Sequence, residues 1–292
     1  MRIGIISNKK GYYGNLLIKA ANARGHDVSV FPIPDISVLI KKNLNKIVHK
    51  GTNLFEMDVI LVRGMTRSPC LRVLIEMIHK RGIRIIDQRL IKTYDNNNKF
   101  YTYMRLEEEG LPFPKTYYIS HPESTHLPQV LENLNTNLPI IAKIGSSSQG
   151  KGVYLIRSQK DLAKVINSLN AKERHQLLFQ KFLEHVGDIR VIVIGYNVIG
   201  AMFRKKKKSE YRSNIAVGAT ACQLEIDNKI AKLASQAAKA VEIEIAGVDI
   251  LISEGKPYVI EVNRAPQFKG FMQATGIDVP CEIIKYCEKV KK

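Results

Sequence analysis

The chain lacks several features that would assign it to a class of proteins at once. Its 292 residues include no tryptophan and only four cysteines, Cys70, Cys222, Cys281 and Cys287, none of which forms a C-x-x-C pair. This spacing argues against a zinc or redox site and favours thiols in the core or on the surface. No apolar run approaches the ~20 residues of a membrane-spanning helix, and the N-terminus has no signal-peptide core. We therefore expect a cytoplasmic protein with no membrane partner.

Acidic residues are scarce relative to basic ones. The sequence has 45 Lys and Arg against 27 Asp and Glu, a net charge of +18, and its first 90 residues hold 16 basic and 6 acidic ones. Such an excess is typical of a nucleic-acid surface, or of a field that attracts anionic substrates such as nucleotides and acidic amino acids. No RNA-binding or DNA-binding motif accompanies it. The charge alone leaves both interpretations open.

The first third of the chain alternates between strand and helix patterns. Strands are predicted at residues 3–6, 28–31, 58–62 and 83–87, and helices at 14–24 and 69–80. This alternation predicts a small parallel α/β domain, whose ligand edge lies at the carboxyl ends of its strands. Arg63 and Gly64 follow the third strand and are candidates for contacting a substrate, with solvated surface as the alternative.

The chain has a glycine-rich loop but lacks a P-loop. Residues 145–152, GSSSQGKG, lie between two apolar strands and do not have the G-x-x-x-x-G-K-[ST] spacing. The backbone N–H groups of such a loop can bind phosphate oxygens, and Lys143 in the preceding strand can reach the same anion. A plain glycine-rich hairpin is the alternative.

The stretch 246–263, AGVDILISEGKPYVIEVN, is predicted to form the β-hairpin around which the chain is organised. With a turn centred on Gly255, antiparallel pairing places Asp249 opposite Glu261, and Asn263 shares the face of Glu261. Opposed carboxylates are destabilising, so the arrangement requires a cation. Two carboxylates and an amide oxygen suit Mg²⁺.

The alternative is a half-buried hairpin whose polar face lies in water. Alternation also places Leu251 and Val259 on the acidic face, which argues against a simply solvated face. The metal site and the half-buried hairpin both stay open on spacing alone.

A basic run, Lys205 to Lys208, lies between Arg204 and the cluster of Arg212, Ser213 and Asn214. Runs of lysine are most often solvated loops. The position of this run suggests a mobile loop that borders an anion site.

Together these features resemble the ATP-grasp superfamily: a basic α/β domain, a polar linker, a strand–loop–strand flap and a terminal hairpin with Asp and Glu-x-Asn. Four segments resemble the RimK family of amino-acid ligases within it: RSN at 212–214, AGVDIL at 246–251, EVNRAP at 261–266 and TGIDV at 275–279. The resemblance covers essentially the whole chain.

The resemblance implies an α/β protein with an ATP-grasp fold. An N-terminal parallel α/β (pre-ATP-grasp) domain is expected at residues 1–92. Two α+β subdomains that enclose the nucleotide follow: a central one with the flap at 93–185, and a C-terminal one with the metal site at 186–292.

The resemblance also implies roles for individual residues. Those expected to bind ATP are Lys99, Lys143, the flap residues Gly145, Ser146, Ser147, Ser148, Gln149, Gly150 and Gly152, the adenine hinge Gln180, Lys181 and Phe182, and also Asp188 and Ser213. Those expected near the transferred phosphate and the acyl group are Arg204, Arg212 and Asn214. Asp249, Glu261 and Asn263 are expected to hold Mg²⁺, for which Mn²⁺ is an alternative.

Two positions depart from the family pattern. Lys181 stands in the hinge where an acidic residue is usual, which leaves backbone contacts to adenine. The segment RAPQFKG at 264–270 stands where related enzymes often have ASPGLEG, which predicts an end-of-site loop shaped for a different substrate.

The leading hypothesis is an ATP-dependent carboxylate–amine ligase that works through an acyl phosphate. It would add L-glutamate, or another amino acid, to an acidic acceptor such as a protein C-terminus, a coenzyme or a peptide, and we expect a homo-oligomer. One alternative is a nucleic-acid-binding protein that retains the fold without ligase activity, although acidic metal ligands disfavour a nucleic-acid partner. Another is an ATP-dependent kinase or synthetase that releases a phosphorylated product.

Overall fold

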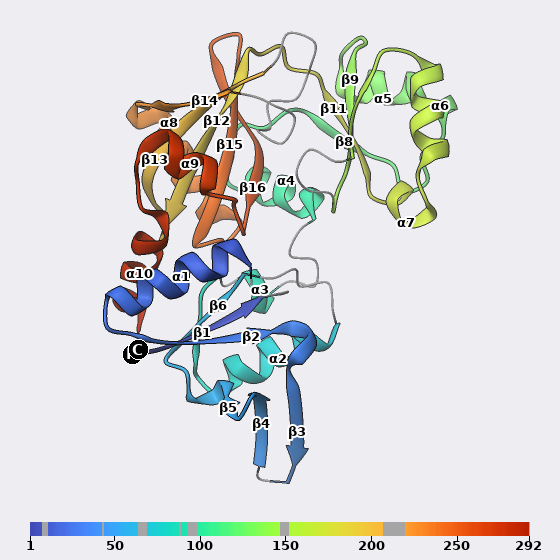
Figure 1. Ribbon diagram of the computed structural model, residues 1–292. Coiled ribbons are helices and arrows are strands. Elements are labelled where there is room, and N and C mark those ends of the chain that lie inside the picture. Colours follow the sequence, from blue (N-terminus) through green and yellow to red (C-terminus); the bar gives the residue numbers. More distant parts are fainter. Residues whose placement is uncertain are drawn as a thin grey trace.

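The described residues form four β-sheets, which are the framework of the protein in a computed structural model (Figure 1). The structure describes residues 1–7, 11–42, 44–63, 69–87, 89–92, 98–146, 152–206 and 220–291. Within these ranges, no helix has the length and apolar character needed to cross a membrane. All four cysteines are free: Cys70 and Cys222 are exposed, Cys281 is half-buried and Cys287 is buried.

A parallel sheet with strand order β2, β1, β6, β7 forms the first unit, as the strand–helix alternation predicts. Its elements are β1 (Arg2–Ser7), α1 (Tyr12–Ala23), β2 (Asp27–Pro32), β6 (Val59–Val62), α2 (Pro69–Lys80), β7 (Arg84–Ile85) and α3 (Arg89–Lys92). Val59 and Leu61 pack with α1, whereas Ile60 and Val62 pack with α2. The run of apolar residues in β6 is therefore buried on both faces, as a covered parallel strand requires.

A small antiparallel sheet is inserted in this unit, and the sequence patterns did not predict it. It consists of β3 (Ser37–Lys41), β4 (Leu44–His49) and β5 (Thr52–Asn53), flanked by the 3-10 turns η1 (Ile33–Asp35) and η2 (Leu54–Glu56). The strands β3 and β4 project beyond the parallel sheet at the bottom of Figure 1.

An antiparallel sheet with strand order β10, β9, β11, β8 forms the second unit, after helix α4 (Lys99–Glu108). Its elements are β8 (Thr116–Tyr118), η3 (Ser124–His126), α5 (Leu127–Leu134), β9 (Ile140–Ile144), β10 (Val153–Ile156), α6 (Gln159–Ser168), α7 (Ala171–Arg174) and β11 (Leu177–Lys181). Ile140, Ala142 and Ile144 pack with α5 and α6. Because side chains alternate along a strand, Lys143 points to the opposite face of β9.

The third unit is a five-stranded antiparallel sheet with strand order β14, β13, β12, β15, β16. Its elements are β12 (Gly187–Ile194), β13 (Asn197–Lys205), β14 (Thr220–Leu224), α8 (Asn228–Ala240), β15 (Ile245–Ser253), β16 (Lys256–Asn263), α9 (Lys269–Thr275) and α10 (Val279–Val290). Helix α8 packs on one face, while α9 and α10 cover the other. Apolar residues of α1 join the cluster around α10, so the sheet is fastened to the first unit.

The terminal hairpin β15–β16 has the predicted pairing of Asp249 with Glu261, but its register differs near the turn. Ile250 lies opposite Val259, so Ile260 is an extra residue, which makes a β-bulge. The bulge places Val259 in the core beneath α8. The prediction that Val259 shares the acidic face is therefore wrong, because one extra residue reverses the alternation.

A buried aspartate joins the first and third units. Asp87 accepts hydrogen bonds through Oδ1 from the backbone N–H groups of Glu244 (2.9 Å) and Ile245 (3.1 Å). Arg84 reinforces the junction, since its Nη2 lies 2.5 Å from Oε2 of Glu244. These contacts hold the parallel sheet against the end of β15.

Candidate active site

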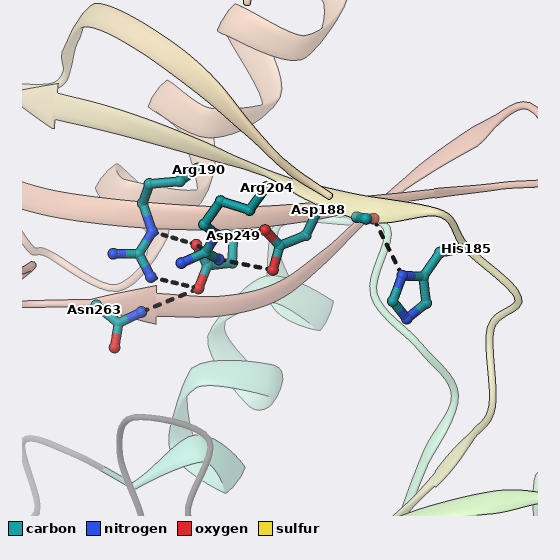
Figure 2. A network of polar contacts seen from close by, with 7 residues as sticks. His185, Asp188, Arg190, Arg204, Asp249 and Asn263 are labelled. Atoms are coloured by element: carbon teal, nitrogen blue, oxygen red, sulfur yellow. Dashed lines mark hydrogen bonds and ion pairs between the residues drawn. The ribbon is translucent and has the colours of Figure 1, made fainter. Parts of the chain in front are cut away.

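Asp249 on β15 lies at the centre of a buried ion-pair network (Figure 2). Arg190 on the neighbouring strand lies opposite it, and both Nε and Nη2 of Arg190 donate to the Asp249 carboxylate, Nη2 at 2.7 Å. Nη2 of Arg204 lies 2.9 Å from Oδ1, and Nδ2 of Asn263 donates to Oδ2 at 3.4 Å. Asp249, Arg190 and Arg204 are all buried.

Arg204 bridges Asp249 and a second buried carboxylate, Asp188. Its Nε and Nη2 donate to the two oxygens of Asp188 at 2.5 and 2.7 Å. The strand register explains the contact, because Asp188 lies opposite Arg204 in the β12–β13 pair. Asp188 and Arg190 are two residues apart on β12 and therefore share one face of the sheet.

Burial and charge act on these two carboxylates in opposite directions. Burial raises the pKa of Asp188 above its ordinary value, although Arg204 opposes the shift. Burial also tends to raise the pKa of Asp249, but Arg190 and Arg204 more than offset this effect and lower the pKa of Asp249 below its ordinary value. Asp249 is therefore held as a carboxylate.

Two lysines complete the charged group around Glu261, the partner of Asp249 across the hairpin. Nζ of Lys99, at the start of α4, lies 3.3 Å from Oε1 of Glu261. Burial lowers the pKa of Lys143 from 10.5 to about 8, while Glu261 and Asp249 act in the opposite direction. Lys143 is thus a poorly solvated ammonium group that faces the two carboxylates.

The charges in this group do not cancel. Four cations, contributed by Lys99, Lys143, Arg190 and Arg204, surround the three carboxylates of Asp188, Asp249 and Glu261. Among the residues that the structure describes, this leaves a surplus of one positive charge, which in a largely buried site favours an anionic ligand.

Tyr103 on α4 is a positioning residue that the sequence patterns missed. Its Oη donates to the backbone oxygen of Ile260 at 2.7 Å and lies 3.5 Å from Oε1 of Gln180. The first contact holds the bulge that brings Glu261 opposite Asp249. The second, with the 2.7 Å hydrogen bond from Nε2 of Gln180 to Oγ1 of Thr116, ties the side chain of the predicted adenine hinge into the protein.

The start of the predicted flap is held against α4. The backbone N–H of Lys99 donates to the oxygen of Gly145 (3.1 Å), and the N–H of Gly145 donates to the oxygen of Gln176 (2.7 Å). A Cβ atom at Gly145 would lie 3.2 Å from both Oδ1 of Asn98 and the Gln176 oxygen, so the close approach favours glycine. Ser146 follows as a half-buried residue.

The remaining predicted residues lie at the margins of the site or outside the described residues. Lys181 is exposed at the end of β11, and Phe182 next to it is half-buried. Gly152 precedes β10, and its carbonyl oxygen accepts from the N–H of Ile144 at 2.8 Å. The predicted residues outside the described ranges are Gly64, Ser147, Ser148, Gln149, Gly150, Arg212, Ser213 and Asn214.

Arg63, a predicted substrate residue, takes part in the junction between the first and third units. Its Nη1 donates to the backbone oxygen of Arg264 at 3.0 Å, and Nη1 of Arg264 donates to the oxygen of Val62 at 2.5 Å. Burial lowers the pKa of Arg63 to about 10 and raises that of the neighbouring Asp87 to about 6. Arg264, the departure from the family pattern, thus fastens the end of the hairpin to β6.

The donor atoms at the hairpin are of the types that bind a divalent cation. Asp249, Glu261 and Asn263 offer two carboxylates and an amide oxygen, and Mg²⁺ is commonly held by one or two carboxylates with further oxygens from substrate phosphates. The described residues contain no cluster of three or more His, Cys, Asp or Glu side chains suited to a metal ion. Since the oxygens of Asp249 already accept from two guanidinium groups, a metal ion would share this carboxylate with the arginines.

Two family models match nearly the whole chain. The model described as RimK PreATP-grasp domain matches residues 1–72, and the one described as RimK-like ATP-grasp domain matches residues 74–287. The chain is 31% identical to a probable alpha-L-glutamate ligase of Maridesulfovibrio salexigens and 32% identical to one of Pseudoalteromonas translucida. Both alignments cover 99% of this chain and 96% of the relative.

A solved structure shares the arrangement of the units. The ATP-grasp ligase PsnB, complexed with minimal precursor, Mg and ADP, superimposes with a TM-score of 0.71 at 18% identity, and the alignment covers 99% of this chain and 98% of that one. At this identity the likeness concerns the fold alone. The ATP-grasp fold expected from the sequence motifs is confirmed.

Proposed function

The chain belongs to the RimK-like ATP-grasp family, and from this premise we propose that it is an ATP-dependent ligase that adds L-glutamate to an acceptor carboxylate through an acyl phosphate. The observation that carries the proposal is the surplus of cations around Asp249 and Glu261. Lys99 and Lys143 converge on these carboxylates from α4 and β9, and phosphoryl transfer depends on positioning and on charge neutralisation.

We infer that ATP and Mg²⁺ bind at this group, with Mn²⁺ as the alternative ion. The likeness in fold to PsnB, whose structure contains Mg and ADP, supports this inference. Asp249, Glu261 and Asn263 would hold the ion, which would supply positive charge that neutralises the phosphates. Lys143 gains from a nearby phosphate because burial disfavours its ammonium form.

The proposed reaction has two steps. An oxygen of the acceptor carboxylate takes the γ-phosphoryl group of ATP and ADP leaves; the glutamate amine then forms a C–N bond to the acyl carbon. The C–O bond breaks, inorganic phosphate leaves with its electron pair and the amine proton passes to solvent. Arg204, which Asp188 and Asp249 hold in place, is proposed near the acyl group together with Arg212 and Asn214. Cationic donors there would stabilise the tetrahedral oxyanion.

The amino-acid donor and the acceptor are assigned by analogy with relatives. The curated relatives are named as probable alpha-L-glutamate ligases, and PsnB was solved with a minimal precursor, so we propose L-glutamate as donor and an acidic polypeptide as acceptor. The net charge of +18 favours an acceptor of this kind. We also propose that the chain divides into three units, at residues 1–92, 93–185 and 186–292, and that the protein forms a homo-oligomer.

Release of ADP from Mg-ATP and L-glutamate, with and without acidic peptides, followed by mass spectrometry of the products, tests this function. We expect a mass increase of one or more glutamyl residues, which is lost in Glu261→Gln. The matched control Glu254→Gln, in the exposed turn of the same hairpin, should keep the activity. An unchanged product from Glu261→Gln, or a phosphorylated product without an amide, would refute the proposal.

A further inference from the structure

The inserted hairpin β3–β4 carries the most unusual surface of the first unit. All five residues of β3 are exposed, including three consecutive aliphatic ones, and the side chains of Val38, Leu39 and Ile40 are 41%, 47% and 74% exposed. Strand β3 lies at the end of its sheet, and no described strand pairs with its outer edge. Exposed apolar edge strands are a liability that proteins usually avoid, so a retained one indicates a binding role.

The two faces of β3 differ in character. Leu39 lies opposite Lys46 on β4, so these two side chains share one face, and Lys41 follows two residues later on the same face. Val38 and Ile40 lie on the other face, where Val38 is opposite the buried Ile47. A strand added to this edge would thus lie beside Leu39 and Lys41 on one face, with Lys46 one strand further in, and beside the aliphatic Val38 and Ile40 on the other.

The charge of the hairpin selects the kind of partner. Residues 36–50 contain four lysines and no Asp or Glu. A second copy of the hairpin would bring like charges together, which is the effect by which lysines on edge strands prevent self-association. The segment also contains no Phe, Tyr or Trp on which a nucleic-acid base could stack. An acidic polypeptide complements the positive charge of the hairpin, and its backbone can pair with the outer edge of β3.

We propose that the outer edge of β3 is a docking strand for an acidic, extended segment of the acceptor polypeptide, which pairs with it as an additional strand. Main-chain hydrogen bonds would supply affinity, and alternation of acidic and apolar side chains would supply specificity. The surface lies outside the active site. The identity of the partner as the acceptor rests on the proposed ligase function, whereas the binding of such a strand does not.

Binding of two labelled octapeptides, followed by fluorescence anisotropy, tests the proposal. One alternates Glu and Val, so that its acidic and apolar side chains fall on opposite faces of a strand. The other has the same composition with the four Glu in one block and the four Val in the next. We expect the alternating peptide to bind about tenfold more tightly, because only its pattern matches the two faces of β3.

Substitutions locate the binding on the hairpin. Lys46→Glu should weaken the alternating peptide about tenfold, while Lys172→Glu, an exposed lysine on α7, should have no effect. Ile40→Thr keeps strand propensity but removes the aliphatic group and should weaken binding several-fold. Its control is Val73→Thr on α2, since Val73 is 54% exposed in the same unit.

Equal affinity of the two peptides, or a hairpin variant that binds as the wild type does, would overturn the proposal. A dimer that Ile40→Thr dissociates, with no change in peptide affinity, would overturn it in favour of a second copy of the chain. Glu261→Gln should still bind the alternating peptide. If that binding persists but no acceptor is ligated, the proposed function fails while the docking strand stands.

Discussion

Lys143 should make nucleotide binding depend on pH in the alkaline range. Burial lowers the pKa of its ammonium group from 10.5 to about 8. This difference corresponds to about 3 kcal/mol by which the folded protein disfavours the charged form, and a bound phosphate recovers part of it. Only the ammonium form attracts phosphate, so affinity should be full below the pKa and should fall as the pH rises through about 8.

The magnitude follows from the proton occupancy of this one group. With a pKa of about 8, Lys143 is about nine-tenths charged at a pH of about 7 and about one-tenth charged at a pH of about 9. If the nucleotide binds only the charged form, the dissociation constant of Mg-ADP should rise about tenfold between these two values. Binding of Mg-ADP is a better probe of Lys143 than the ligase reaction, because the amine of the amino-acid substrate, which also titrates, takes no part in it.

Isothermal titration of Mg-ADP at the two pH values measures this effect. Lys143→Arg should bind with little change over the range, because a guanidinium stays charged. Lys164→Arg, an exposed lysine on α6, serves as the control and should keep the tenfold change. A wild-type dissociation constant that stays constant, or a Lys143→Arg variant that keeps the full pH dependence, would refute the assignment of the titrating group to Lys143.

Two further predictions concern stability. Asp249→Asn should destabilise the protein by about 3–5 kcal/mol, because it removes the buried carboxylate that Arg190 binds through two nitrogen atoms. Arg190→Met should cost less, because Arg204 still pairs with Asp249, and the double variant should cost less than the sum of the two in denaturant unfolding; additive costs would contradict a direct pair. Gly187→Ala should lower the melting temperature, because the added Cβ would lie 2.3 Å from a backbone oxygen of β13. The control Gly14→Ala, on α1, adds its Cβ in open space and should raise the melting temperature. Equal shifts of the two variants in thermal unfolding would contradict the packing argument.

The missed residues of the active site differ in how far the sequence could have revealed them. Arg190 lies two positions after Asp188 on β12, so alternation along a strand places both on one face. Tyr103 and Asp87 carry no such signal, because their partners, Ile260 and the N–H groups that follow α8, are more than 150 residues away. The hairpin β3–β4 was missed because its exposed strand lacks the alternation on which strand prediction depends.

The pairing of Asp249 with Glu261 shows how a correct prediction can have an incomplete reason. Counting residues from a turn centred on Gly255 gives this pair. The observed turn is centred half a residue earlier, between Glu254 and Gly255, and the bulge at Ile260 restores the pairing of Asp249 with Glu261. The acidic face is therefore predictable, whereas the position of Val259 is not. A bulge is stabilised by contacts outside the hairpin, such as the hydrogen bond from Tyr103, and no local pattern records them.

Local patterns in the chain were sufficient for the parallel α/β unit of the first third, the terminal hairpin and the motifs that resemble the RimK family, because helix and strand periodicity and turn residues act over short distances. Folding alone brought four cations from α4, β9, β12 and β13 to the three carboxylates. It also determined which charges are desolvated, and hence that the pKa of Lys143 falls to about 8 while Asp249 stays ionised between two arginines. Burial and the distance between charges are properties of packed elements, which is why the sequence could propose candidate residues such as Asp249 and Glu261 but not the electrostatics around them.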